Sequence, residues 1–491
     1  MISGRKIDYR DISFIIYFMI SLFLTIMHEP FKNEAQAWLI VRDLDLPGIM
    51  NIMWYEGTPA LWHLLLFPLV KLGLPYFSMQ LLHWIFAVII IWLILYKSPF
   101  PAIFRVLFSF SYYFLYEYSA IARNYNITIL LMFLLATIWK RKQELPFLFC
   151  LLVILIINTN LIIWGFGVMV TLLFFYDGKC SHRKFSISHY ISLIILVAGF
   201  ALMFFQIIPR DQASDQSVVS FSFFDLKFPE MILRAPANAI ISVGGDPESM
   251  VIPFFFFLCS TAVLFLLVKK VPIFLATILS SAWCIYMFMF IYSGGVRHHG
   301  YLLIIFIFFF WIRDYYKDSD WISRLVPRYI LSDAFKHGVF LIVALCLLTT
   351  VMRMIAIIPQ EIRYEFSGSK EIAQYIKQNN LEEKNWIGYR SDRCEAILPY
   401  FADKKFWYAG IQDYGSYVVW NTEYKLNADL SSEDIITRIH RNFPERKDLL
   451  LILSKPLENP EEHGFRLIYQ NQKRVFWLHD EHYYLYLPVI K

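Results

Sequence analysis

The chain has little charge for its length. Asp, Glu, Lys and Arg together make up 17% of its 491 residues, whereas hydrophobic residues make up 58%. Soluble globular domains contain about 25% charged residues, so the composition excludes an ordinary soluble domain. The formal net charge of +5 is too small to indicate a nucleic-acid partner. The positions of the few charges are therefore more informative than their sum.

Cysteine pairs and glycine-rich loops are missing as well. The six cysteines form no CxxC pair, which argues against a disulfide framework and against a thiolate metal site. No Gly-rich phosphate loop is present in the sequence, so a nucleotide site of that kind is not expected. The first apolar run begins at Ile12 after several basic residues and lacks a small-residue cleavage site. We interpret it as a retained membrane span and not as a signal peptide.

Long apolar runs are what the chain has in abundance. A run of roughly 18 or more apolar residues is long enough to cross about 30 Å of hydrocarbon. The runs predict an α-helical polytopic membrane protein, with the lipid bilayer as its surroundings. The predicted spans are 11–28, 77–96, 100–118, 125–139, 146–160, 161–176, 187–208, 251–268, 272–292, 300–312 and 337–358.

One further apolar segment, 59–73, is predicted not to cross. At ~1.5 Å per residue it reaches only about 23 Å, and it contains His63, a proline and Lys71. If it lies in the interface, most basic residues between the spans fall on the side of the N-terminus, as the positive-inside rule requires. We therefore predict about eleven spans, a cytoplasmic N-terminus and two long outer loops. These are 28–76, with its interfacial helices, and 209–250.

The last part of the chain, 359–491, is charged and has only short apolar runs. Helices are predicted at 369–379 and 431–443, and strands in the stretches NWIGYR, KFWYAG, LLLILS and YYLYLP. Alternating helices and strands are typical of a small α/β domain. After an odd number of spans in a transmembrane domain of 1–358, this domain is expected to be extracytoplasmic.

Polar residues gather at the predicted outer surface. In NEAQAWLIVRD, Glu34 and Trp38 share one face of a helix, where a carboxylate could act as a general base or position a metal ion. The alternative is an amphipathic helix with Trp38 as an interfacial anchor. In WYEGTPALWH, Glu56 and His63 flank a turn into a helix. The alternative there is a simple loop-to-helix junction with a solvent-facing carboxylate.

A third polar group is YEYSAIARNYN, in which Glu117 and Arg123 lie between two spans among tyrosines such as Tyr125. Charged residues at membrane depth are usually paired or functional. Arginine can bind a phosphate through two parallel hydrogen bonds, so Arg123 is a candidate phosphate ligand. The alternative is a structural ion pair between Glu117 and Arg123.

The fourth polar group is GGVRHHGY, 294–301. Its glycines predict a flexible outer turn around Arg297, His298 and His299. A cation cluster that binds phosphate is the functional interpretation, and a tight polar turn is the alternative. Adjacent histidines on one turn are poorly placed to share a metal ion.

This layout resembles the GT-C superfamily of polyprenyl-phosphate-dependent glycosyltransferases, in the family 39-like branch of protein O-mannosyltransferases and the lipid A aminoarabinose transferase. In that branch the first outer loop begins with an acidic motif and continues to a Pro-containing aromatic helix. NEAQAW and EGTPALW occupy these two places, and ARNY resembles the motif after the third span. The resemblance covers residues 10–210.

The resemblance implies a GT-C-like fold and inverting transfer of a sugar from a polyprenyl-phosphate donor. The acceptor would be an extracytoplasmic glycan, lipid or protein of the cell envelope, and the membrane a bacterial inner membrane. The family's first acidic residue corresponds to Asn33 here. The base would therefore be Glu34, with Glu29 and Glu56 as alternatives. The implied substrate contacts are Arg123, Tyr125, Arg297, His298, His63, Trp38 and Lys71; a divalent metal ion as cofactor is left open.

The competing interpretation is a non-enzymatic polytopic membrane protein, either a transporter or a scaffold in envelope assembly. A transporter is expected to carry polar or broken segments at mid-membrane, often in repeated halves. Here the polar residues concentrate at the outer ends of the spans, and the sequence contains no repeat. The pattern therefore favours the enzyme.

Overall fold

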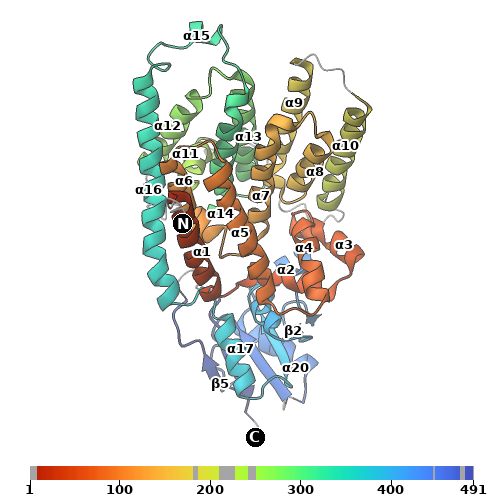
Figure 1. Cartoon of the computed structure of the whole chain (residues 1–491). Coiled ribbons are helices and arrows are strands. Elements are labelled where there is room, and N and C mark those ends of the chain that lie inside the picture. The colour runs from red at the N-terminus through yellow and green to blue at the C-terminus, as the bar shows by residue number, and fades with distance from the viewer. Residues whose placement is uncertain are drawn as a thin grey trace, which may run out of the picture.

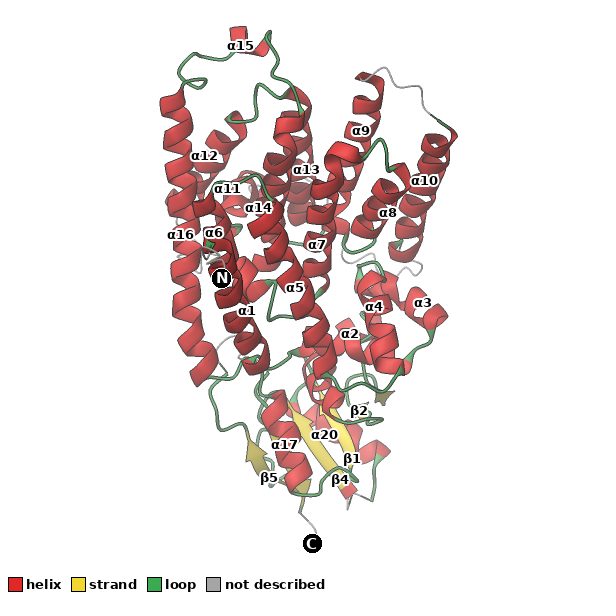
Figure 2. Ribbon diagram, in the orientation of Figure 1, coloured by secondary structure: helices red, strands yellow, loops and turns green. Residues whose placement is uncertain are grey.

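The computed structural model describes residues 8–180, 186–208, 227–240, 250–445, 448–475 and 481–489, without the side chains of 227–229 and 323. A bundle of helices forms one end of the molecule and a small sheet with its own helices forms the other (Figure 1). The strands are confined to that second end (Figure 2). The two ends meet at three short helices from the first predicted outer loop.

Helices of very different lengths make up the bundle. They are α1 (Tyr9–Met27), α5 (Phe77–Lys97), α6 (Ala102–Phe110), η1 (Tyr113–Glu117), α7 (Asn124–Ile138), η2 (Trp139–Arg141), α8 (Pro146–Ile157), η3 (Leu161–Ile163), α9 (Trp164–Cys180), α10 (Ile187–Ile207), α11 (Lys227–Asn238), α12 (Val251–Phe265), α13 (Val271–Phe290), α14 (Val296–Ile312), η5 (Arg313–Tyr315), α15 (Ile322–Leu325) and α16 (Asp333–Arg363).

Among the described residues, 7 helices are long and apolar enough to cross a membrane. They contain α1, α5, α9, α10, α13, α14 and α16. The other predicted spans contain the shorter helices α6, α7, α8 and α12. The chain is thus a polytopic helical protein by the length and composition of its helices.

The predicted outer loop 209–250 is wrong in part. Residues 227–238 form α11, which packs against α12, α13 and α14 inside the bundle. Charged residues on one side of this helix, such as the Glu230–Arg234 pair with N–O at 2.6 Å, hide its apolar side from a search for continuous apolar runs. Residues 209–226 and 241–249 lie outside the described residues.

The predicted turn at 294–301 is wrong in part: Gly294, with φ at 72°, lies in a turn, but the helix begins at Val296. Arg297, His298 and His299 lie in the first turn of α14, where the backbone N–H of Gly295 donates to His298 Nδ1 at 2.9 Å. Gly300 serves close packing, because a Cβ atom there would lie 2.2 Å from the Tyr118 hydroxyl oxygen. The glycine is needed for contact with its neighbours and not for flexibility.

The predicted first outer loop, 28–76, forms α2 (Lys32–Asp43), α3 (Leu46–Glu56) and α4 (Leu61–Lys71). Asp45 caps α3 by accepting from the Gly48 N–H at 2.8 Å, and Gly57 ends it with φ at 64°, a conformation that glycine adopts without strain. The segment predicted not to cross is α4. It is a short helix packed against α2, beside the sheet end of the molecule (Figure 1).

The C-terminal part folds into an α/β unit. Its elements are α17 (Ser369–Gln378), β1 (Asn385–Tyr389), α18 (Ser391–Cys394), η6 (Glu395–Tyr400), β2 (Phe406–Tyr408), β3 (Asp413–Gly415), α19 (Thr422–Leu426), α20 (Ser432–Asn442), β4 (Leu449–Leu453), β5 (Phe465–Gln470) and β6 (Tyr484–Pro488). The two predicted helices and all four predicted strands are present. The sequence did not predict β3 and β5.

The sheet has six strands in the order β3-β2-β1-β4-β6-β5. β2, β1 and β4 are parallel, and the outer strands are antiparallel. Alternate residues of β4 point to opposite faces, so Leu450 and Ile452 pack against α17 and η6 while Leu449 and Leu451 pack against α20. Helices therefore cover both faces.

Helix α2 contributes to the core of this sheet unit. Ala35 and Leu39 are fully buried and belong to the same apolar cluster as residues of α17, η6 and β1. Helix α2 and the C-terminal unit therefore form one packed body, and this body positions the polar groups of α2.

Basic residues gather at the end of the bundle opposite the sheet. Lys142 Nζ lies 2.8 Å from Asp177 Oδ2, Tyr316 donates to the same carboxylate at 2.6 Å, and Lys270 donates to the Tyr316 carbonyl at 2.6 Å. The loops after α7, α12 and α14 thus meet at one end. This grouping agrees with the separation of charge that the positive-inside rule predicts.

Candidate functional site at the junction of bundle and sheet

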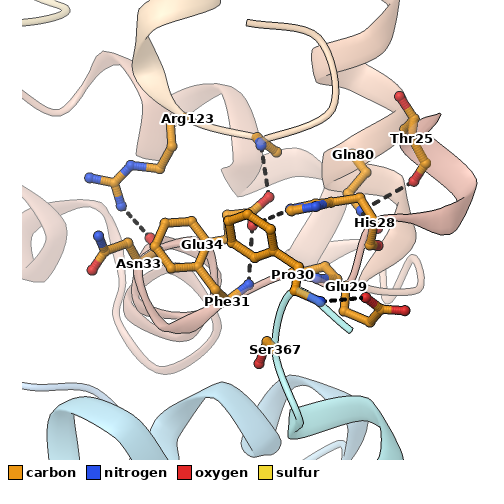
Figure 3. A network of polar contacts seen from close by, with 12 residues as sticks. Thr25, His28, Glu29, Pro30, Phe31, Asn33, Glu34, Gln80, Arg123 and Ser367 are labelled. Atoms are coloured by element: carbon orange, nitrogen blue, oxygen red, sulfur yellow. Dashed lines mark hydrogen bonds and ion pairs between the residues drawn. The ribbon is translucent and has the colours of Figure 1, made fainter. Parts of the chain in front are cut away.

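Glu34 lies at the centre of a buried network where the bundle meets the sheet (Figure 3). It is the third residue of α2, and its Oε2 accepts from the N–H of Phe31, which precedes the helix, at 3.1 Å. Its Oε1 accepts from the Ala122 N–H at 2.7 Å. Glu34 is 0% exposed, so its carboxylate caps one helix and holds the turn before another.

His28 joins this carboxylate to a second one. Its Nε2 lies 3.1 Å from Glu34 Oε2 and its Nδ1 3.1 Å from Glu361 Oε1. Tyr116 donates to the other oxygen of Glu361 at 2.7 Å. Burial alone would lower the pKa of His28, but the two carboxylates outweigh it and raise the pKa to about 10. A charged imidazolium between two carboxylates thus ties together the ends of α1, α2 and α16.

Both oxygens of Glu34 are therefore engaged, and this geometry favours a structural role over that of a base. Glu29, another candidate base, accepts from the Phe366 N–H at 3.0 Å and faces the chain that leads from α16 into the sheet unit (Figure 3). Burial raises the pKa of Glu29. These two carboxylates fasten the junction.

Glu56, at the C-terminal end of α3, is more exposed to solvent than Glu34. It is half-buried, and Gln36 Nε2 donates to its Oε1 at 2.7 Å. Gln36 is itself fixed by both polar groups of the Val418 backbone, at 2.7 and 2.9 Å. Burial raises the pKa of Glu56 to about 6, although Gln36 and Arg123 act to lower it. An oriented carboxylate that titrates near neutral pH is suited to general acid–base chemistry.

His63, on α4, is buried with 4% exposure. Neither of its ring nitrogens has a hydrogen-bond partner within the described parts of the chain. Burial and the positive charge of Arg123 lower the pKa of His63 to about 3, so the ring is neutral. A neutral imidazole has one donor and one acceptor, so His63 places two unpaired polar atoms in the protein interior.

Arg123 lies immediately before α7 and connects these groups. Its guanidinium donates to the backbone carbonyl of Asn33, and its charge acts on both Glu56 and His63. It also acts on Tyr125 and His298, whose side chains share a hydrogen bond of 2.7 Å. The structure thus places Arg123, Glu56 and His63 close together, with Tyr125 and His298 on the bundle side.

Arg297 belongs to a separate charged layer. Its Nε lies 2.8 Å from Glu117 Oε1, and Tyr112 donates to the same carboxylate. The guanidinium of Arg353 lies 3.8 Å from the centre of the Tyr112 ring. The alternative interpretation, an ion pair between Glu117 and Arg123, is therefore wrong, because Glu117 pairs with Arg297.

Two predicted substrate contacts lie elsewhere. Lys71 donates to the Arg42 carbonyl at 3.0 Å on an exposed surface. Trp38 is 5% exposed, and its ring packs against Tyr76 with centroids 5.4 Å apart, so it is a core residue and not an interfacial anchor. No group of three or more His, Cys, Asp or Glu residues that could hold a metal ion occurs in the described ranges.

Sequence reasoning missed four residues of these networks: Gln36, Glu361, Arg353 and Trp420. Arg353 and Glu361 carried a usable signal, because a charged residue within or at the end of an apolar span is usually paired or functional. Gln36 lies inside the NEAQAW motif itself. The indole of Trp420 interacts with Glu56. No sequence pattern near Trp420 predicts this contact, because Trp420 belongs to the C-terminal unit and Glu56 to the segment 28–76.

An apolar cavity of about 230 Å³ lies beside the charged layer, among α6, α11, α12, α13, α14 and α16. Its walls include Phe108, Leu302 and Thr350. Thr350 lies one helical turn from Arg353, so the two side chains share a face of α16. One end of the cavity therefore leads toward the cationic groups.

No protein-family model matches the sequence, and no curated protein and no solved structure matches the chain.

Proposed function

We propose that the chain is a GT-C-type membrane glycosyltransferase. It transfers a sugar from a polyprenyl-phosphate donor to an extracytoplasmic acceptor, with its N-terminus cytoplasmic and its C-terminal unit outside. One observation carries this proposal. A poised carboxylate, a guanidinium and a neutral imidazole stand together at one end of the helical bundle, on the side where an apolar cavity approaches the half-buried Arg297 and Arg353.

Glu56 is the general base in this proposal. The acceptor hydroxyl oxygen attacks the anomeric carbon, while the Glu56 carboxylate takes the hydroxyl proton. The bond between the anomeric carbon and the phosphate oxygen breaks, and its electron pair leaves with the phosphate. With a pKa of about 6, Glu56 is mostly ionised at neutral pH and still basic enough to accept the proton.

Arg123 and His63 act on the donor. Charge develops on the departing phosphate oxygen, and a guanidinium stabilises it through charge-assisted hydrogen bonds. A neutral imidazole beside it adds a donor without a second positive charge. His28, Glu34 and Glu361 hold the loop that carries these groups and do not themselves touch the substrate.

The apolar cavity suits the lipid part of the donor. Its lining side chains are almost entirely hydrophobic, and burial of apolar chain there is favoured by about 25 cal/mol per Å². Arg297 and Arg353 lie beyond its outer end, where the phosphate of a bound lipid would be neutralised. A lipid-linked donor is consistent with the lack of a Gly-rich nucleotide loop in the sequence.

Turnover by the purified full chain in nanodiscs tests the proposal. The preparation is incubated with polyprenyl-phosphate sugars and candidate envelope acceptors, and products are identified by mass spectrometry. We expect a glycosylated acceptor and free polyprenyl phosphate in equal amounts, and Glu56→Gln should abolish both. Glu144→Gln, an exposed glutamate at the opposite end, is the matched control. Donor binding without turnover under any condition would favour the scaffold or transporter interpretation.

A further inference from the structure

Gln36, on α2, lies between the proposed base and the C-terminal unit. Its side chain is buried, with 4% exposure. Its Nε2 donates to Glu56 Oε1 at 2.7 Å and to the Val418 carbonyl at 2.7 Å, and its Oε1 accepts from the Val418 N–H at 2.9 Å. A glutamine amide has two N–H donors, so both donors of Gln36 are used, one on each partner.

The contact with Val418 determines which end of the amide faces the carboxylate. If the amide were turned over, its NH₂ group would meet the Val418 N–H. Its oxygen would then face both the Val418 carbonyl and the Glu56 carboxylate. Each of these contacts would set two donors or two acceptors against each other, which is costly for buried groups. The backbone of the C-terminal unit therefore keeps an N–H donor directed at Glu56.

The segment 416–420 of the C-terminal unit is bonded to α2 at two points. Ser416 donates to the Asp43 carboxylate, and Val418 holds Gln36. Gln36 and Asp43 are about two helical turns apart and so lie on the same side of α2. Ser416 and Val418 are each 2% exposed. The segment therefore packs along α2 in a buried position, where it can keep Gln36 in one orientation.

Several charged or titratable groups act on Glu56, or it on them, besides this amide: Arg123, Trp420, Tyr417 and Glu395. Burial raises the pKa of Glu56, and Gln36 opposes this more strongly than Arg123 does. Burial also raises the pKa of Glu395, on η6, well above its ordinary value. Glu395 is therefore neutral and adds no negative charge beside Glu56. The amide of Gln36 is thus a main support of the charged form of Glu56.

We propose that Gln36 is a positioning residue for Glu56 and that the segment 416–420 holds Gln36 in this role. The inference rests on the proposed transferase function, in which Glu56 takes the proton of the acceptor hydroxyl. It adds that the C-terminal unit completes the catalytic site. The backbone of this unit orients the amide, and the amide orients the carboxylate and stabilises its negative charge.

Infrared titration of the full chain in nanodiscs tests the inference without turnover. The spectrum of Glu56→Gln is subtracted from that of the wild type to isolate the carboxyl band of Glu56. Gln36→Met is treated in the same way with its own Glu56→Gln double variant. We expect the wild-type band to titrate near pH 6. In Gln36→Met the midpoint should be about one pH unit higher, because a hydrogen bond to the charged form is lost.

Gln80→Met is the matched control. Gln80 is also 4% exposed, and it donates to the backbone carbonyls of Thr25 and His28 (Figure 3). Its replacement should lower the melting temperature and leave the Glu56 midpoint unchanged. Gln36→Asn is the second variant if Gln36→Met does not fold. It keeps the amide on a shorter side chain that cannot reach both partners, so the midpoint should again rise.

Turnover gives an independent readout. We expect kcat of Gln36→Met to fall roughly tenfold at pH 7, because misplacement of a catalytic group lowers the rate, with an unchanged acceptor KM. The acidic limb of its pH–rate profile should move upward together with the infrared midpoint. A role of Gln36 in folding alone would lower the melting temperature and leave both midpoints unchanged.

The outcomes separate the inference from the proposed function. If the midpoint rises in the Gln36 variants but no donor supports transfer, Gln36 positions Glu56 and the transferase function is wrong. If transfer occurs and the Gln36 variants keep the wild-type kcat and midpoint, the function stands and the inference is wrong. The inference is also wrong if Gln80→Met moves the midpoint as far as Gln36→Met does.

Discussion

Glu34 and Glu56 belong to the same loop but have opposite surroundings. Glu34 is fully buried and receives two backbone N–H groups and a charged imidazole. Glu56 is half-buried and interacts with the Gln36 amide and the Trp420 indole. A carboxylate whose two oxygens already accept hydrogen bonds is a poor proton acceptor. A carboxylate with a raised pKa and partial exposure to solvent is a good one. The position of Glu34 in the motif pointed to the base, but its contacts favour Glu56.

Replacement of Glu56 tests this assignment. We expect Glu56→Gln to lower kcat by roughly 10²–10⁴-fold, the usual effect of removing a general base, with normal melting. The deprotonated carboxylate is the active form, so the wild-type rate should fall as pH decreases through about 6. A pH–rate profile of the wild type and of Glu144→Gln provides the comparison. A flat profile between pH 5 and 8 would contradict the role of Glu56.

His28 is expected to stabilise the fold. Its removal leaves Glu34 and Glu361 as buried carboxylates without their cation, and loss of one partner of a buried ion pair costs roughly 3–5 kcal/mol. We therefore expect a lower melting temperature for His28→Gln and none of this effect for His337→Gln, which is exposed.

The pH dependence of melting follows from the same residue. The pKa of His28 is higher in the folded chain, at about 10, than its ordinary value of 6.5. The stabilisation is therefore fully present below pH 6.5 and is lost as pH rises through about 10. Alkaline melting curves of the wild type and His28→Gln should converge. If they stay parallel, the imidazolium is not the source of the difference.

The first turn of α14 and the C-terminal half of α16 carry the charged layer beside the apolar cavity. Arginine binds phosphate with two parallel hydrogen bonds, whereas lysine keeps the charge but loses this geometry. We expect Arg297→Lys and Arg353→Lys to weaken binding of polyprenyl phosphate by roughly tenfold, corresponding to about 1.4 kcal/mol for a lost charge-assisted bond.

Binding of a labelled polyprenyl phosphate to protein in nanodiscs measures this effect. Arg324→Lys, on the exposed α15, is the matched control. Unchanged affinity in both variants would mean that Arg297 serves only its pair with Glu117 and that Arg353 serves only Tyr112.

Helix α2 belongs to two units at once, since its polar side meets the bundle and Ala35 and Leu39 enter the core of the sheet unit. Leu39→Ala should cost about 2–5 kcal/mol through the cavity it leaves. Because the lost contacts join the two units, we expect faster proteolysis near α17 and a lower melting temperature. Leu426→Ala, at a site 76% exposed, should behave as the wild type. Equal protease resistance of both variants would show that α2 does not hold the sheet unit.

At the scale of the whole molecule, the two ends of the helical bundle differ in their charge and in the elements attached to them. One end carries α2, α3, α4 and the sheet (Figure 1). The other end gathers basic residues such as Lys142 and Lys270. With Cys180, the exposed cysteine, replaced by Ala, we expect Glu144→Cys to be shielded from impermeant thiol reagents in intact cells. Glu433→Cys on α20 should be labelled. The reverse pattern, or labelling of both, would place the proposed site on the cytoplasmic face and remove its lipid-linked donor.

Much of this architecture is readable from local pattern. The length and composition of apolar runs indicate a polytopic helical protein, because crossing hydrocarbon imposes a minimum helix length. The short length of the 59–73 run predicted a single short helix, and α4 has 11 residues. Alternation of short apolar runs predicted the two helices and four of the strands of the C-terminal unit. These features depend on neighbours within a few turns of chain.

The partners of the polar residues were decided only by the folded arrangement. His28 meets Glu361 across 333 positions of sequence, and Gln36 meets Val418 across 382. No local period encodes such pairings, since they depend on how helices and sheet pack. For the same reason the sequence favoured Glu34 as the base and left Glu56 as an alternative. Burial, which is a property of the packed molecule, separates a carboxylate that holds the junction from one that can exchange a proton.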